Sequence, residues 1–115
     1  MRGSKEYQVL LFYKYVTLQS PEAVAIWLHM LAECYNLTGR GIVAEEGINV
    51  TLEGLLDDTE QFVGEFLAEP EFSDVQIKRS AGDGKAFPKL SVKVREEIVG
   101  TKFTKEEANP EVKTA

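Results

Sequence analysis

The sequence has one cysteine, Cys34, and one histidine, His29, among its 115 residues. A single cysteine excludes an internal disulfide and is typical of a reduced, cytoplasmic protein. The two residues lie five apart in a predicted helix, so their side chains diverge by about 140°. That angle excludes a Cys–His catalytic pair or a metal site built from both within the helix. We expect Cys34 to be a small buried apolar residue and His29 a surface or boundary residue.

Long apolar runs and an excess of positive charge are also missing. No stretch approaches the roughly 20 apolar residues that span a bilayer, so we expect no membrane partner. The first residues lack the apolar core of a signal peptide, and we interpret 1–6 as a disordered N-terminus or a tag remnant. The net charge is −6. An acidic domain is not typical of a free-standing nucleic-acid binder, because neutralising phosphates supplies most non-specific affinity.

What is present fits one globular domain, with 43% hydrophobic and 28% charged residues. The segment from Tyr7 to Val16 is apolar on both parities, which predicts a central strand. Ser20, Pro21 and Glu22 predict a helix start: a capping hydroxyl, a proline at the first helical position and an acid in the first turn. The helix should run to about Tyr35 or Asn36. Its predicted buried stripe contains Val24, Trp27, Leu28, Leu31 and Tyr35.

A hairpin is expected next, with strands Ile42–Glu45 and Ile48–Glu53 joined by a turn at Glu46–Gly47. Gly39 and Gly41 should mark the turn that precedes it. In the second strand the apolar and polar residues alternate, so one parity should face the core.

The rest of the chain predicts a second helix and two more strands. Asp57 should cap the helix with Glu60 reaching back, and Pro70 should end it. Phe62, Val63, Phe66 and Leu67 should form its buried face. A short strand is expected at Val75–Lys78, a loop at Ala81–Lys85 and an alternating strand at Leu90–Val94. We interpret 100–115 as a polar linker or tail.

This order of elements predicts an α+β, ferredoxin-like (acylphosphatase-like) βαββαβ sandwich with an extra C-terminal strand possible. The expected sheet is antiparallel, with two helices on one face and the other face open. Asn49, Thr51, Glu53, Ser91, Lys93 and Arg95 should lie on the open face. If Gln8, Leu10, Phe12 and Lys14 also lie there, the face exposes apolar surface that could dock another domain. The alternative is that the sheet simply curls or that a tail covers it.

Charge is distributed unevenly. Residues 45–74 contain ten acids and no base, whereas residues 78–95 contain six bases and one acid. The basic stretch could contact phosphates of an RNA backbone. The alternative is a solvated strand, with Lys93 and Arg95 pairing with Glu53 across the sheet.

No self-sufficient active site is indicated. Glu45 and Glu46 are neighbours at a turn and are not an obvious acid–base pair. The glycines match neither a phosphate-binding loop nor a dinucleotide fingerprint.

Three blocks together resemble one family: Phe12-Tyr13-Lys14-Tyr15, the run from Gly39 to Asn49 (GRGIVAEEGIN), and the run from Lys89 to Val99 (KLSVKVREEIV). They are similar to the N-terminal domain of the rhodanese-related tRNA uridine hydroxylases. The resemblance implies that residues 7–99 form an acylphosphatase-like domain preceding a rhodanese domain. It also implies a full-length oxidoreductase that uses molecular oxygen to make 5-hydroxyuridine at the tRNA wobble position, with no cofactor in this domain.

Two departures from the family stand out. Val50 follows G-I-N where the family often has a small residue, and the cysteine loop of the rhodanese domain is absent, so its role is not carried over to Cys34. This domain is therefore expected to be non-catalytic and to help bind tRNA or dock the rhodanese domain. The candidate contact residues are Lys14, Arg40, Glu45, Glu46, Gly47, Asn49, Lys89, Lys93 and Arg95.

Three other classes stay open. A free acylphosphatase needs a phosphate-cradling loop with an arginine after the first strand, but here the loop reads Val-Thr-Leu-Gln-Ser. A stand-alone RNA-binding sheet needs aromatic residues on its two central strands, and Phe12 could serve on only one. A regulatory or protein-interaction module without a tRNA role is the third.

Overall fold

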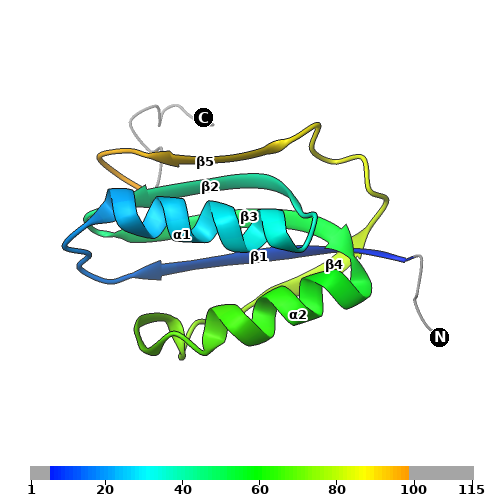
Figure 1. The fold of residues 1–115 in the computed structure, drawn as a ribbon, viewed down its shortest axis with the longest axis horizontal. Helices are drawn as coiled ribbons and strands as arrows, with labels where there is room; N and C mark the ends of the chain where they lie inside the picture. Colours follow the sequence, from blue (N-terminus) through cyan, green and yellow to red (C-terminus); the bar gives the residue numbers. More distant parts are fainter. Residues whose placement is uncertain (1–5, 99–115) are drawn as a thin grey trace.

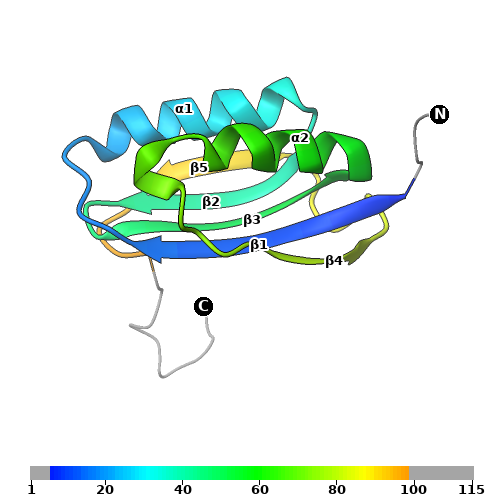
Figure 2. The same cartoon turned by 90° about the horizontal axis from the view of Figure 1, so that it is seen from below.

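A computed structural model describes residues 6–98, which form two layers (Figure 1). The elements, in chain order, are β1 (Tyr7–Tyr15), α1 (Pro21–Cys34), β2 (Thr38–Ala44), β3 (Gly47–Leu55), α2 (Leu56–Leu67), the 3₁₀ turn η1 (Pro70–Phe72), β4 (Lys78–Gly82) and β5 (Leu90–Val94). Both α-helices cover the same face of the sheet, and within residues 6–98 the opposite face carries no helix (Figure 2). The predicted α+β, ferredoxin-like architecture is therefore confirmed.

The sheet has the strand order β4-β1-β3-β2-β5. All its pairs are antiparallel except β2 with β5, which run parallel. The sheet is thus mixed rather than purely antiparallel. The extra C-terminal strand exists and extends the sheet beyond β2, at the edge opposite β4.

The two helices begin in different ways. In α1 the Ser20 hydroxyl accepts a hydrogen bond from the Ala23 amide, and Pro21 occupies the first turn, as predicted. The capping box predicted for α2 is wrong: the helix begins at Leu56 without a side-chain cap. Glu60 is used elsewhere, because it accepts hydrogen bonds from the Gln8 amide and the Arg79 guanidinium.

Aromatic side chains fill the layer between the helices and the sheet. Phe66 lies at the centre, with ring centroids 4.8 Å from Phe12 and 5.1 Å from Phe72. Trp27 of α1 stacks on the outer side of this group, 5.8 Å from Phe72. Burying such rings supplies much of the free energy that holds a helix layer on a sheet.

The side chains of β1 point to the opposite faces of the sheet from those we considered. Leu10 and Phe12 point into the core and are buried, together with Gln8. The odd-numbered residues of β1 therefore lie on the open face. The expected exposed apolar surface exists, but it is formed by tyrosines and a leucine of the other parity.

Several predicted boundaries shift. Gly39 and Gly41 lie within β2 rather than in a turn, and β2 pairs with β3 from Thr38 onward. At Gly39 the backbone has a φ of +140°, and an added Cβ would lie 2.1 Å from the Thr51 carbonyl oxygen. Glycine is needed there because of this close approach. The strand expected at Val75–Lys78 instead spans Lys78–Gly82, and Val75 belongs to the core.

Two single-residue expectations also have clear outcomes. Cys34 is exposed at the end of α1, so the prediction of a buried apolar role was wrong. His29 is a boundary residue, as expected. The interpretation of 100–115 as a linker, and most of that for 1–6, falls outside the described residues. No helix within residues 6–98 is long and apolar enough to cross a bilayer.

Candidate functional site

The helix-free face of the sheet, hereafter the open face, exposes large side chains of β1. Tyr13 is 63% exposed, Tyr15 58% and Leu11 44%. The two tyrosine rings meet edge to face, with centroids 6.4 Å apart. A row of exposed rings and aliphatic carbon on a small domain is typical of a contact surface.

The strand register places cations beside this row. Leu11 pairs with both Thr51 and Lys78, and Thr51 pairs in turn with Arg40. These side chains share the open face because directly paired residues point the same way. Lys78 is therefore the direct neighbour of Leu11 on one side, and Arg40 lies beyond Thr51 on the other.

A second register row lies next to the first. Tyr13 pairs with Asn49, Asn49 with Ile42, and Ile42 with Lys93. Lys93 is exposed, and within residues 6–98 neither it nor Arg40 has an ion-pair partner. The pairing of Lys93 and Arg95 with Glu53 that we considered is not found, because Glu53 is used at the other end of the sheet.

The two layers of the molecule have opposite charge. Neither α1, α2 nor η1 contains a lysine or an arginine, and together they carry the acids Glu22, Glu33, Asp57, Asp58, Glu60, Glu65 and Glu71. The basic side chains Arg40, Lys78 and Lys93 lie on the open face instead. An overall acidic protein thus gathers Arg40, Lys78 and Lys93 on one side, away from the acidic helices.

Glu53 closes one end of the open face. Its carboxylate is 1% exposed and accepts hydrogen bonds from the backbone amides of Asp83, Gly84 and Ala86 at 2.9–3.1 Å. Gly84 can take part because its φ is +79°, a conformation that favours glycine. The buried charge is satisfied by these donors and holds the β4–β5 loop against the sheet.

The chain after β5 closes the opposite end. The Ile98 amide donates to the Glu46 carboxylate, and the Asn49 side chain donates to the Ile98 carbonyl, both at 2.9 Å. Ile98 itself is fully buried. Because Asn49 lies on the open face, residue 98 is held on that face, next to the β2–β3 turn.

The other predicted contact residues are more dispersed. Lys14 points to the helix side, where its ammonium binds the Asp74 carboxylate at 2.6 Å and the Glu71 carbonyl. This contact lowers the pKa of Asp74 below its ordinary value. Gly47 has a structural role, since an added Cβ would lie 2.0 Å from the Lys14 carbonyl oxygen. Glu45, Lys89 and Arg95 are exposed at the periphery.

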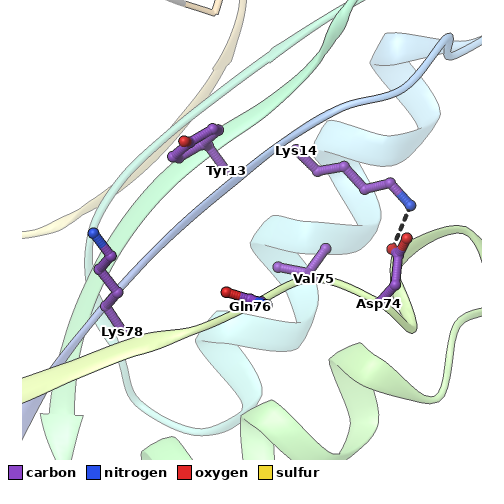
Figure 3. Close-up of a pocket in the computed structure, with 6 residues that line it drawn as sticks. All are labelled: Tyr13, Lys14, Asp74, Val75, Gln76 and Lys78. Atoms are coloured by element: carbon purple, nitrogen blue, oxygen red, sulfur yellow. Dashed lines mark hydrogen bonds and ion pairs between the residues drawn. The ribbon is translucent and has the colours of Figure 1, made fainter.

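A shallow hollow of about 340 Å³ adjoins the open face at the edge of β1 (Figure 3). It lies where β1 and the segment leading into β4 diverge, because β4 pairs with β1 only as far as Leu11. Its lining combines a ring, two cations, a carboxylate, an amide and an apolar floor. The lining residues are Tyr13, Lys14, Asp74, Val75, Gln76 and Lys78.

The described residues hold no cluster of three or more potential metal-ligating side chains. The loop after β1 is also poorly suited to cradle a phosphate. The amides of Val16 and Leu18 donate to the carbonyls of Glu46 and Glu45, so these two donors are already used. The loop has no arginine to replace them.

Residues 7–98 match the family described as the UPF0176 acylphosphatase like domain. The chain belongs to this family. UPF0176 relatives named tRNA uridine(34) hydroxylase are 47% identical over 92 residues in Rhodococcus jostii, 45% over 92 residues in Corynebacterium kroppenstedtii and 37% over 110 residues in Bacillus velezensis. These matches cover 80%, 80% and 96% of this chain but only 32%, 31% and 34% of the relatives. The chain thus spans about a third of the length of these relatives.

Solved structures agree with the UPF0176 acylphosphatase-like fold at low sequence identity. The acylphosphatase of Bacillus subtilis superposes with a TM-score of 0.58 at 16% identity, covering 75% of this chain and 97% of that one. The BLUF protein BlrB has a TM-score of 0.67 at 15% identity, covering 88% and 80%. These likenesses show the fold alone.

Sequence reasoning missed three features of this UPF0176 surface. The roles of Tyr13 and Tyr15 depend on the parity of β1, which a strand apolar on both sides does not reveal. The role of Glu53 depends on a loop 30 residues away. Glu53 shares the parity of Asn49 and Thr51, so in the sequence it is one more polar residue of the open face and carries no signal for that contact.

Proposed function

We propose that this chain is the N-terminal accessory domain of a tRNA uridine(34) hydroxylase and that its open face helps to hold the tRNA. The relatives that match it carry that name and are about three times as long. The domain would contribute binding and orientation, while a downstream domain would carry out the chemistry.

The observation that carries the tRNA role is the separation of charge between the two layers. A polyanion is attracted to the face with Arg40, Lys78 and Lys93 and repelled by the helices, which carry acids and no base. Such a field both binds the backbone and sets its orientation. An acidic net charge is compatible with this role when the domain adds contacts to a larger protein.

The proposed partner within the same protein is a rhodanese domain. Glu46 and Asn49 hold residue 98 on the open face, so a polypeptide that continues from there starts on the tRNA-binding side. A domain that follows could then share the bound RNA with this face. We further propose a cytoplasmic location, with molecular oxygen as the oxidant used by the full-length enzyme.

A regulatory or protein-interaction module is the alternative, and the exposed apolar carbon of Leu11 favours it. A stand-alone acylphosphatase is disfavoured, because two amides of the loop after β1 are used within the fold and no arginine is present.

A domain exchange tests the proposal. Residues 7–98 would replace the matching segment of the Rhodococcus jostii hydroxylase, and hydroxylation of tRNA uridine 34 would be measured. We expect the chimera to be active and its Arg40→Gln/Lys93→Gln variant to show a raised KM for tRNA. The matched control is Gln19→Glu/Gln61→Glu, which changes the net charge equally outside the open face. An equal rise of KM in both variants would contradict a role specific to this face.

A further inference from the structure

We propose that the hollow beside Tyr13 binds one unpaired nucleotide of a single-stranded RNA, with the base stacked on the tyrosine ring. The proposed function supplies the class of ligand, and this inference names the subsite and its chemistry. The wobble position of a tRNA lies in a single-stranded loop, where bases can leave the stack.

The first step of the argument is the availability of the ring. Tyr13 is 63% exposed although it lies on a central strand, flanked by β3 on one side. Among the aromatic rings of the described residues, only that of Tyr15 contacts the Tyr13 ring, and the two meet edge to face. Because Tyr13 is largely exposed, its ring is accessible to a planar ligand, and base–aromatic stacking suits every base.

The second step is the chemistry next to the ring. Lys78 pairs with Leu11, so it lies diagonally adjacent to Tyr13 on the same face. Its exposed ammonium can meet a phosphate. Gln76, also exposed, offers an amide that both donates and accepts, which matches the edge of a base.

The third step is the shape and the fixed wall of the hollow. Its volume of about 340 Å³ is at the small end of ligand sites, which suits a single nucleotide. The far wall is held by the ion pair between Lys14 and Asp74, and the buried Val75 forms the floor (Figure 3). Because the Lys14 ammonium is already paired with Asp74, Lys78 is the lining cation that remains for the ligand.

The charged and polar side chains around the Tyr13 ring favour RNA over a protein segment as the ligand. Lys78 lies diagonally adjacent to Tyr13, Arg40 and Lys93 lie on the same face beyond β3, and the carboxylate in the hollow is paired with Lys14. A protein partner would gain mainly from apolar area, whereas a nucleotide uses the ring, the cations and the amide together.

The test is fluorescence anisotropy of the 115-residue chain with a labelled eight-nucleotide oligouridylate and with an RNA duplex. We expect the single strand to bind more tightly. Tyr13→Phe should bind as the unchanged chain does, and Tyr13→Leu should bind at least about fivefold more weakly, the equivalent of about 1 kcal/mol of stacking. Met30→Leu, an exposed residue of α1, is the matched control and should change nothing.

The two Tyr13 variants distinguish base stacking from protein docking. Leucine keeps apolar surface but loses the aromatic face, so unchanged RNA binding by Tyr13→Leu would overturn the inference and favour protein docking. Equal affinity for the duplex and the single strand would also overturn it. If Tyr13→Leu weakens oligouridylate binding while the hydroxylase chimera is inactive, the nucleotide site stands and the proposed function fails. If Tyr13→Leu binds oligouridylate as the unchanged chain does while the chimera is active, only the nucleotide site is contradicted and the proposed function stands.

Discussion

At the scale of single residues, the buried carboxylate of Glu53 organises the β4–β5 loop. It accepts three backbone amides from a segment about 30 residues further along the chain. Gly82 also depends on it, since an added Cβ would lie 2.3 Å from a carboxylate oxygen of Glu53. One side chain thus fixes the loop that joins the two opposite edge strands.

Replacing Glu53 by glutamine should lower the free energy of unfolding by about 1–3 kcal/mol, because a neutral amide accepts more weakly and brings donors that meet other donors. Urea unfolding followed by circular dichroism measures the change. Glu45→Gln, at an exposed turn position, is the control and should stay within about 0.5 kcal/mol of the unchanged chain. Equal stability of the two variants would mean that the loop does not depend on the charge.

At the scale of elements, two glycines make a matched comparison. Gly39 lies in β2 with a positive φ and no room for a Cβ, whereas Gly64 lies in α2 with open space around it. Gly39→Ala should destabilise the fold by more than about 2 kcal/mol. Gly64→Ala should stabilise it by about 0.5–1 kcal/mol, because alanine is the better helix former. Thermal unfolding checks both, and a tolerated Gly39→Ala would contradict the close approach of β2 to β3.

Two carboxylates link elements and make stability depend on pH. The Arg79 guanidinium lowers the pKa of Glu60, and the Lys14 ammonium lowers that of Asp74. A group with a lowered folded-state pKa stabilises the fold above its unfolded pKa, and this contribution is lost as the pH falls through the folded value. The free energy of unfolding should therefore decline as the pH drops below about 4.

The double variant Glu60→Gln/Asp74→Asn tests this assignment. It should show a shallower decline of stability in acid than the unchanged chain, measured by urea unfolding at a series of pH values. Glu69→Gln serves as the control, since the Glu69 carboxylate has no partner within residues 6–98. An unaltered acid dependence in the double variant would show that other groups control it.

The elements themselves were largely predictable, because they depend on local patterns. Ser20 and Pro21 gave the start of α1, and the alternation in 90–94 gave β5 with its bounds. The cap of α2 was not predictable, because Glu60 is drawn away by Arg79, a partner 19 residues along the chain. The start of β2 was missed because Gly39, ordinarily a turn residue, is used for close strand packing.

At the scale of the whole molecule, the separation of charge could be predicted only in part. The sequence shows an acidic and a basic stretch, but Arg40 lies in neither. It joins Lys78 and Lys93 on one face through the strand order, which brings β2 between β3 and β5. The candidate residue Lys14 does not belong to this group, because even-numbered residues of β1 point toward the helices.

The central claim is that the open face meets the phosphates of tRNA. The most direct measurement is the salt dependence of tRNA binding by this chain. Arg40→Gln/Lys93→Gln should reduce the slope of log K against log salt by about 2, since each cation releases about one counterion. Gln19→Glu/Gln61→Glu, which lowers the net charge by the same amount, should leave the slope unchanged. Equal slopes for the unchanged chain and the Arg40→Gln/Lys93→Gln variant would contradict the claim.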